Sequence, residues 1–162
     1  MNMQTFKKFY TSKSQVNKYG LFVKKSYKKG DFIDYIKGPT ECVKEFPQSK
    51  LDQIINWIGA SRHTWINTDK SPFRFINHSC DPNVAVVTKR KVLAIKDISA
   101  DSEITMDYAF TEGDSEWEIV PCECGSSVCR GKITGISRVP KPVFRKYQPY
   151  ISETFKNIYH SR

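Results

Sequence analysis

Short apolar runs separated by polar turns occupy most of the chain and predict strands rather than long helices. Residues 18–23 lead from a glycine into an apolar run, and 32–36 follow a Lys-Lys-Gly-Asp turn. The remaining strand-like runs are 64–67, 84–87, 92–95 and 104–106. The second and third of these are joined by four polar residues and predict a hairpin. The pattern therefore predicts a mainly β domain with peripheral helices, in which small sheets fold around each other.

Helical periodicity occurs in two segments. In the first, Ser49 is the predicted N-cap and Gly59 the predicted stop. Apolar side chains recur between them at i, i+3, i+4 and i+7, namely at Leu51, Ile54, Ile55 and Ile58. In the second, prolines at 140 and 142 predict a break, after which apolar residues recur at helical spacing within 150–159. This C-terminal stripe favours a helix packed on the domain, although an aromatic face could also bind a partner.

Length and composition are those of one globular domain. The 162 residues are 39% hydrophobic and 27% charged, which is enough to bury a core without covalent staples. No apolar run approaches the ~18 residues of a transmembrane helix, and no signal-peptide pattern follows the first lysines. We therefore expect an intracellular protein, cytoplasmic or nuclear, with no membrane partner. In a reducing compartment the five cysteines indicate metal ligands rather than disulfides.

The net charge of +9 is unevenly distributed. Residues 1–30 carry +8 and residues 130–162 carry +7, whereas the segment between them carries −6. Within 101–123 there are eight acidic residues and no basic one. The basic ends could contact nucleic acid or could form an ordinary solvated surface. The acidic middle, which holds the motifs described below, suits a cationic peptide instead. The pattern makes no prediction about oligomeric state.

One stretch, Phe73–Asn83, concentrates the candidate chemistry. Its hydrogen-bonding or metal-capable side chains are Asn77, His78, Ser79, Cys80, Asp81 and Asn83. Burying so many polar groups costs free energy unless partners satisfy them, although turn chemistry alone also favours Asn, Asp, Ser and Pro. A C-x-C-x4-C motif at 122–129 supplies three thiols, and a structural zinc needs four ligands. Cys80 is the predicted fourth ligand, which leaves Cys42 as a small buried or partly buried residue.

Three motifs, in order, carry a resemblance to a known family. RFINHSCDPN at 74–83, ITMDY at 104–108 and CECGSSVCRG at 122–131 resemble the core of SET-domain protein lysine methyltransferases with a post-SET zinc motif. The resemblance covers residues 16–135. The compact chain is also similar to the small stand-alone SET proteins of bacteria. Because three separate motifs agree, the resemblance is specific.

The resemblance implies a domain organisation and a topology. The implied parts are a basic N-terminal extension (1–15), the SET domain (16–112), the post-SET zinc segment (113–135) and a C-terminal helical extension (136–162). The family fold contains a pseudoknot, in which the C-terminal part of the domain threads beneath a loop. That topology would bring Tyr108 and the Asn77–His78 segment together at one crevice.

The resemblance also implies S-adenosylmethionine as methyl donor, one structural zinc, and a basic, lysine-containing protein such as a histone as substrate. Tyr108 matches the catalytic tyrosine, whose hydroxyl lies beside the transferring methyl group. Residues implied to hold S-adenosylmethionine are Lys18, Tyr19, Gly20, Tyr35, Arg74, Asn77, His78 and Tyr108 itself. Those implied to line the substrate channel are Met106, Phe110 and Trp117, and the implied zinc ligands are Cys80, Cys122, Cys124 and Cys129, with Cys42 excluded.

Two features leave alternatives open. Where the family places two glycines around one residue, only Gly20 matches, and Lys18 occupies the first position. This departure favours a catalytically inactive, zinc-stabilised module that binds peptide or nucleic acid. The rings of Phe110 and Trp117 could wall the lysine channel or an adenine pocket, or could equally be core. Retention of the catalytic tyrosine together with the Asn-His motif favours the enzyme.

Overall fold

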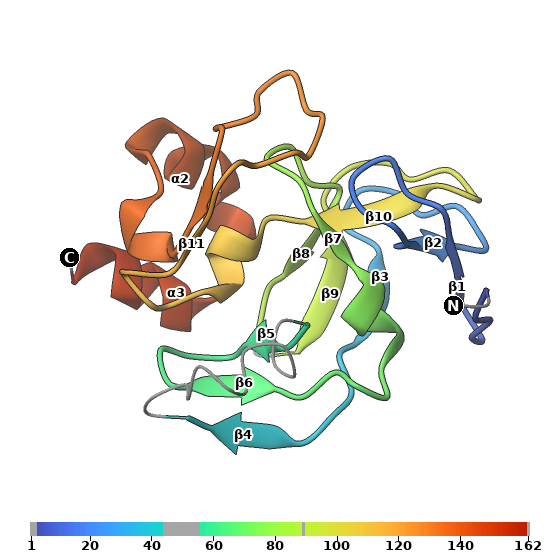
Figure 1. Cartoon of the computed structure of the whole chain (residues 1–162), viewed down its shortest axis with the longest axis horizontal. Coiled ribbons are helices and arrows are strands. Elements are labelled where there is room, and N and C mark those ends of the chain that lie inside the picture. The colour runs from blue at the N-terminus through green and yellow to red at the C-terminus, as the bar shows by residue number, and fades with distance from the viewer. Residues whose placement is uncertain (1–2, 44–55, 89, 162) are drawn as a thin grey trace.

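The computed structural model describes residues 3–43, 56–88 and 90–161 and arranges them as small sheets with short helices around them (Figure 1). The strands are β1 Phe9–Ser12, β2 Gly20–Val23, β3 Phe32–Tyr35, β4 Thr40–Cys42, β5 Ile58–Gly59, β6 Thr64–Ile66, β7 Asn77–His78, β8 Val84–Val86, β9 Lys91–Ala94, β10 Glu103–Met106, β11 Glu118–Ile119 and β12 Ile133–Thr134. They form the sheets β1-β2-β10-β7, β3-β9-β8, β4-β6-β5 and β11-β12. The predicted mainly β architecture is confirmed.

The first sheet joins segments that are far apart in the sequence. Strands β1, β2 and β10 pair antiparallel, while β10 pairs parallel with the short β7. In that last pair Thr105 lies opposite Asn77 and Met106 lies opposite His78. The strand that precedes Tyr108 therefore runs beside the Asn-His segment. This is the juxtaposition of Tyr108 with the Asn77–His78 segment that the family topology implies.

The hairpin predicted from the valine-rich runs is confirmed. Strand β8 pairs antiparallel with β9, with Val84 opposite Ala94 and Val86 opposite Val92. Valine side chains fit the pleated, buried surface of a strand, and all three residues of β8 are buried. The sheet continues to β3, which pairs with β9 through an irregular register between Phe32 and Asp34. A bulge of this kind re-aims the strand that follows it.

The helix predicted to start at Ser49 falls largely on residues 49–55, which lie outside the described residues. Its predicted end is wrong, because Ile58 and Gly59 form strand β5 rather than a last helical turn. Ile58 pairs with Ile66, and Gly59 pairs with Trp65. A Cβ atom at Gly59 would collide with the backbone carbonyl oxygen of Thr111. The glycine is needed here for close packing of two chain segments, not as a helix stop.

The prolines at 140 and 142 begin a helix rather than break the chain, contrary to the sequence prediction. The helices are η2 Pro72–Phe75, η3 Tyr108–Thr111, η4 Ile136–Arg138, α2 Lys141–Tyr147, η5 Gln148–Tyr150 and α3 Glu153–His160. Pro140 is the N-cap of α2 and Pro142 lies in its first turn, where a missing N–H leaves no helical bond unmade. The predicted C-terminal helix is confirmed as α3, and its Tyr159 ring stacks on Phe144 at 3.7 Å.

Two clusters of buried apolar side chains hold these elements together. The first lies among the sheets and includes Leu21, Ile33, Ile66 and Ile104, each with no exposed surface. Fully burying such a side chain contributes about 1.5–3 kcal/mol. The second joins the C-terminal helices to η3 and η4 through aromatic residues, so the predicted aromatic stripe of α3 is packed inside the molecule. Figure 1 places α2 and α3 at the opposite end of the molecule from β1 and β2, with β7, β8 and β10 between them. No helix within the described residues is long and apolar enough to cross a membrane.

Candidate functional site

The polar turn that follows β7 is clamped to β10 by its own side chains and backbone. The amide nitrogen of Ser79 donates to the carbonyl oxygen of Met106 at 3.0 Å. The side chain of Asn83 donates to the carbonyl oxygen of Glu103 at 2.8 Å and accepts from the amide of Thr105 at 2.8 Å. These bonds satisfy polar groups that burial would otherwise leave without partners. The turn is therefore rigid enough to present neighbouring side chains in fixed positions.

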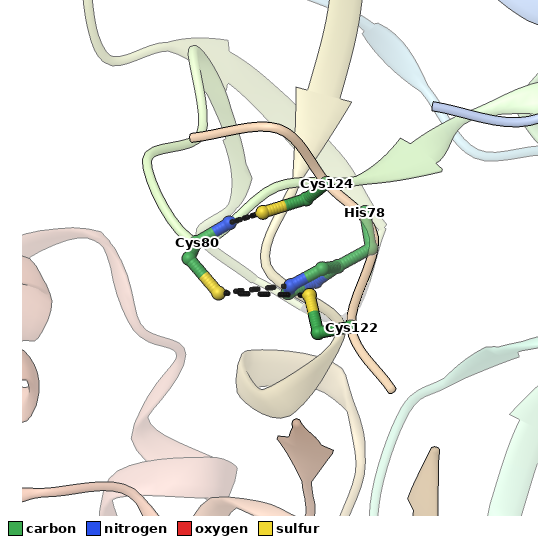
Figure 2. A group of neighbouring side chains, drawn as sticks. All are labelled: His78, Cys80, Cys122 and Cys124. Atoms are coloured by element: carbon green, nitrogen blue, oxygen red, sulfur yellow. Dashed lines mark hydrogen bonds between the residues drawn. The ribbon is translucent and has the colours of Figure 1, made fainter. Parts of the chain in front are cut away.

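Ligand atoms capable of holding a metal converge on this turn (Figure 2). One nitrogen of His78 and the sulfur atoms of Cys80, Cys122 and Cys124 all lie within 4.8 Å of one another. The sulfur of Cys129 contacts the thiols of Cys122 and Cys124 and lies 3.4 Å from the carbonyl oxygen of Cys122. The structure thus brings three of the four cysteines singled out in the sequence together with His78, while Cys129 lies beside this group and not within it. Cys42 lies on β4 and is exposed, so the prediction that it is buried or partly buried is wrong.

The electrostatics of these thiols suit a cation. Burial raises the pKa of Cys80 to about 11 and also raises that of Cys122. Burial opposes ionisation of Cys124 too, yet hydrogen bonds from the amides of Cys80 and Ser126 lower its pKa to about 7. Burial, and to a lesser degree repulsion from a neighbouring thiolate, keeps the thiols of Cys80 and Cys122 protonated, whereas Cys124 ionises more readily. A divalent ion would relieve that repulsion, and sulfur is a preferred ligand of zinc.

Backbone N–H groups also point at the sulfur atoms. The amide of Cys80 lies 3.5 Å from the sulfur of Cys124, and the amide of Arg130 lies 3.4 Å from that of Cys80. The amide of Gly131 lies 3.4 Å from the sulfur of Cys129. Such outer donors orient thiolate ligands and offset their charge. The donor set and its surroundings therefore fit a structural zinc.

His78 belongs to this group of possible ligands and also contacts the turn that carries Tyr108. Burial lowers the pKa of His78 to about 4, so its ring is neutral at physiological pH. Its Nδ1 accepts a hydrogen bond from the amide of Tyr108 at 3.3 Å, which leaves the proton on Nε2. That Nε2 lies 3.3 Å from the sulfur of Cys80. The imidazole thus bridges the thiol cluster and the Tyr108 turn.

Tyr108 opens η3 immediately after β10 and turns its ring toward β7. Its hydroxyl donates to the carbonyl oxygen of Ile76 at 2.7 Å, and its ring makes an edge contact with His78 at 5.3 Å. Burial, followed by the nearby charge of Glu103, raises the pKa of the phenol above its usual value. The side chain is therefore a neutral hydroxyl over the whole physiological range. It can orient a reacting group but cannot serve as a phenolate base.

Asn77 ties the predicted cofactor loop to the same sheet edge. Its side-chain amide donates to the carbonyl oxygen of Tyr19 at 2.9 Å, to the carboxylate of Glu103 at 2.7 Å and to the hydroxyl of Ser14 at 3.1 Å. A Cβ atom at Gly20 would collide with the carboxylate of Glu103, so a larger residue there would displace that side chain. The side chain of Lys18 is exposed. Tyr19, Gly20 and Asn77 are thus brought together, beside the strand that leads to Tyr108.

Other predicted site residues lie in different surroundings. Arg74 donates to the carbonyl oxygen of Asp69 at 2.9 Å and lies over the ring of Phe75. Tyr35 is 53% exposed and lies beside Phe32. Phe110 is buried against Tyr147. Trp117 is half-buried, and its carbonyl oxygen accepts hydrogen bonds. Met106 is buried on β10 opposite His78. Phe110 thus belongs to the second apolar cluster.

Sequence reasoning missed Asp107 and Arg130, although they flank Tyr108 and Cys129. The guanidinium of Arg130 makes two hydrogen bonds, of 2.7 and 2.8 Å, to the carboxylate of Asp107. The carboxylate has no exposed surface. A buried acid requires a partner. The position of Asp107 directly after a buried strand could therefore have indicated that this carboxylate is buried and paired. The sequence pattern does not indicate which basic residue pairs with Asp107.

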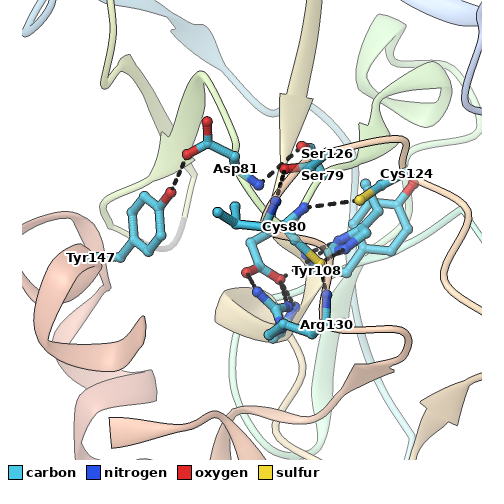
Figure 3. Close-up of polar contacts among 12 residues, drawn as sticks. Ser79, Cys80, Asp81, Tyr108, Cys124, Ser126, Arg130 and Tyr147 are labelled. Carbon is cyan, nitrogen blue, oxygen red and sulfur yellow. Dashed lines mark hydrogen bonds and ion pairs between the residues drawn. The ribbon is translucent and has the colours of Figure 1, made fainter. Parts of the chain in front are cut away.

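A second charged cluster joins the C-terminal extension to the polar turn (Figure 3). Asp81 accepts a hydrogen bond from the hydroxyl of Tyr147 on α2 at 2.8 Å and forms ion pairs with Lys96 and Lys146. The bond from Lys96, with those from Tyr147 and Lys146, lowers the pKa of Asp81 to about 2. The residue after Cys80 is therefore held by a helix that lies beyond the thiol motif in the sequence.

Comparison with known proteins gives a consistent result. Residues 18–109 match the family described as SET domain. The histone-lysine N-methyltransferase, H3 lysine-4 specific, of Saccharomyces cerevisiae is 31% identical over 137 residues, which cover 74% of this chain and 12% of that protein. The protein of the same name from Schizosaccharomyces pombe is 31% identical over 140 residues, covering 77% of this chain and 15% of that protein. This chain thus spans less than a sixth of either relative's length.

Proposed function

The chain belongs to the SET-domain family, and from this premise we propose that it is an S-adenosylmethionine-dependent N-methyltransferase acting on lysine in a basic protein segment. The single observation that carries the proposal is the junction of Tyr108, His78 and Asn77. The Tyr108 amide bonds to the His78 ring, and Asn77 holds the backbone of Tyr19. Matched relatives are named as histone-lysine methyltransferases, which supports a lysine side chain as acceptor.

The residues that would hold the methyl donor are those at the edge of the first sheet. Asn77, His78 and the backbone of Tyr19 and Gly20 offer hydrogen-bonding groups there, beside the carboxylate of Glu103. S-adenosylmethionine supplies a methyl group on a positively charged sulfur. The chain's part in the reaction is alignment, because in-line attack needs the reacting atoms in one fixed geometry. The rigid β7–β10 pairing is suited to that task.

The target lysine must lose a proton before it can attack. A free lysine has a pKa of about 10.4, and a dry channel beside a positive charge disfavours its ammonium form. With the donor bound, the nitrogen lone pair would form the new N–C bond as the S–C bond breaks, and the electron pair of that bond would stay on sulfur. Tyr108 remains a neutral phenol, so it orients the methyl group and the proton leaves to water.

The four clustered thiols would hold one structural zinc. Cys80 comes from the turn after β7, whereas Cys122, Cys124 and Cys129 come from the segment before β12. A zinc bound between them would fix one wall of the cofactor site, because His78 contacts both Cys80 and the amide of Tyr108. The ion has no place in the methyl-transfer step. Its contribution is to order the turn.

The proposal is tested by titrating S-adenosylmethionine into the protein in a calorimeter and by mass spectrometry of a lysine-rich histone peptide. We expect saturable binding of one equivalent and addition of methyl groups to lysine. Tyr108→Phe should bind the cofactor within about threefold of the unaltered protein but lose at least about 100-fold in methylation rate. The matched control is Tyr10→Phe, which removes a hydroxyl bonded to Asp101 at the surface. Absence of cofactor binding by the zinc-loaded protein would contradict the proposal.

A further inference from the structure

An ion pair with little solvent contact connects the thiol segment to the turn that carries Tyr108. Arg130 directly follows Cys129, and Asp107 directly precedes Tyr108. The two Arg130–Asp107 hydrogen bonds are 2.7 and 2.8 Å long, and the side chains of Arg130 and Asp107 are 12% and 0% exposed. Figure 3 shows Arg130 close to both Cys80 and Tyr108. A planar guanidinium that grips both oxygens of a carboxylate fixes orientation as well as distance.

The Asp107 end of the pair shapes the Tyr108 turn. Its Oδ1 accepts a hydrogen bond from the amide of Ala109 at 3.1 Å and so caps η3. The same oxygen lies 3.6 Å from Nδ1 of His78. One carboxylate thus adjoins the base of η3 and the ring that contacts Tyr108. A shift of this carboxylate would move both.

The backbone of Arg130 contacts the thiol cluster. Its backbone amide donates to the sulfur of Cys80 at 3.4 Å, while its guanidinium holds Asp107. The backbone position of Arg130 is therefore tied to the metal ligands, and its side chain is tied to η3. If the thiol segment becomes disordered, the backbone of Arg130 is no longer held in one position, and its guanidinium can no longer be kept beside Asp107. The carboxylate would then be left buried without its partner, which is unfavourable.

We propose that the Asp107–Arg130 ion pair is a positioning device that couples metal binding in the thiol segment to the order of the Tyr108 turn. The inference rests on the proposed zinc site, and it assigns both residues to positioning and neither to contact with substrate. It explains why the base is arginine: lysine carries the same charge but cannot grip both oxygens. The Tyr108 turn would then reach its ordered form only when the thiols are loaded.

The test compares amide hydrogen exchange of residues 108–111 in the zinc-free protein and with one equivalent of zinc, without cofactor or peptide. In the unaltered protein zinc should slow exchange at the Ala109 and Phe110 amides, which bond to Asp107, by about tenfold or more. In Arg130→Gln, zinc should still bind at one equivalent but slow that exchange by less than about twofold. Arg130→Lys should be intermediate.

The matched control is Arg138→Gln, which removes an arginine from an exposed ion pair with Glu118 and should keep the full effect of zinc. Asp107→Asn decides the case if Arg130→Gln fails to bind zinc, because it breaks the pair at the residue that does not directly neighbour a cysteine in the sequence. Asp107→Asn should bind zinc and lose the slowing. Retained slowing in either variant, no slowing in the unaltered protein, or loss of zinc from both variants would overturn the inference. None of these results depends on methyl transfer, so they are separable from failure of the proposed activity.

Discussion

The chemistry of the candidate site depends on a few buried polar groups, each of which has a partner that fixes its state. The hydroxyl of Tyr108 is held by the carbonyl oxygen of Ile76, and the ring of His78 is neutral because burial lowers its pKa to about 4. Neither group changes charge between pH 6 and 8, since both pKa values lie outside that range. We therefore expect neither group to contribute pH dependence to the reaction in that interval.

Met106 is the residue whose side chain we expect to set the extent of methylation. It lies two residues before Tyr108, is buried, and pairs with His78 across the sheet. Its thioether is at best a weak acceptor, and its flexible stem can make room for a methylated amine. We expect the unaltered protein to proceed beyond monomethyl-lysine. In Met106→Tyr a hydroxyl able to hold the amine, worth about 1 kcal/mol, should shift the products several-fold toward the monomethyl form.

Mass spectrometry of a peptide over many turnovers measures this product distribution. Met106→Phe is the matched control, because it differs from Met106→Tyr only by the hydroxyl and carries the same risk of overpacking. It should retain the higher methylation states. If the unaltered protein stops at monomethyl-lysine, another residue limits the reaction.

At the level of elements, the site is the meeting point of β7, β10, η3 and the thiol segment. The parallel pairing of β7 with β10 sets Met106 opposite His78, and η3 follows directly with Tyr108. The thiol segment joins from a distant part of the sequence through Cys80 and through the Asp107–Arg130 pair. The thiol segment is joined by side-chain contacts, whereas β7 and β10 are joined within one sheet. A metal bound by the thiols would therefore help to hold this segment against the others.

We predict one zinc per chain, bound by Cys80, Cys122, Cys124 and Cys129. Cys80→Ser should bind zinc at least about 100-fold more weakly, because a structural site relies on all four ligands. Affinity for S-adenosylmethionine and thermal stability should fall with it. Metal analysis after gel filtration measures the zinc content, and calorimetric titration measures the affinity for S-adenosylmethionine.

Cys42→Ser is the control for this prediction, since Cys42 is exposed on β4 and should leave zinc content unchanged. Cys129→Ser separates the four-thiol site from one in which His78 is the fourth ligand. A full equivalent of zinc retained in Cys80→Ser would refute the assignment of that ligand. The same result in Cys129→Ser would assign His78 in its place.

The molecule as a whole has two apolar clusters and a strongly divided charge. The first cluster holds the sheets, while the second fixes α2 and α3 against η3 and η4. The helices within residues 136–160 are therefore packed into the domain, and Tyr147 and Lys146 reach back to Asp81 beside the thiols. The acidic stretch 101–123 contrasts with basic segments on either side. Its residues Asp114, Glu116 and Glu123 are exposed and able to attract a cation.

We expect this acidic stretch to favour lysines embedded in basic sequence. Charges across an interface raise association rate and specificity, and salt screens them, since the Debye length falls from about 30 Å at 0.01 M to about 8 Å at 0.15 M. The KM for a basic peptide should therefore rise several-fold over that range, with little change in kcat. The double variant Glu116→Gln, Glu123→Gln should show the same rise at low salt.

Steady-state methylation assays with peptides of basic and acidic flanks measure this preference. Glu153→Gln on α3 is the control, because its carboxylate is exposed but pairs with Lys156 within its own helix. Equal KM values for the two peptides at low salt would rule out selection by charge.

The sequence by itself determined the local structure and the chemistry available to this protein. Alternating valines specify the β8–β9 hairpin, helical spacing specifies α3, and turn residues mark the strand ends. These signals are local, because each depends on side chains a few positions apart. The three motifs also identified the family and named the thiols, the Asn-His pair and the tyrosine. Those assignments required residue types in order and no knowledge of distance.

Only the tertiary structure decided which of these residues meet. Ile58 and Gly59 are a strand because β6 pairs with them and Thr111 packs close, and Pro142 begins a helix because α2 packs on η3 and its neighbours. Phe110 belongs to that same apolar cluster. The Asp107–Arg130 pair joins residues 23 positions apart whose meeting no local pattern encodes. The physical reason is that buried charges and close backbone contacts are settled by packing between distant segments, where burial outweighs local preference.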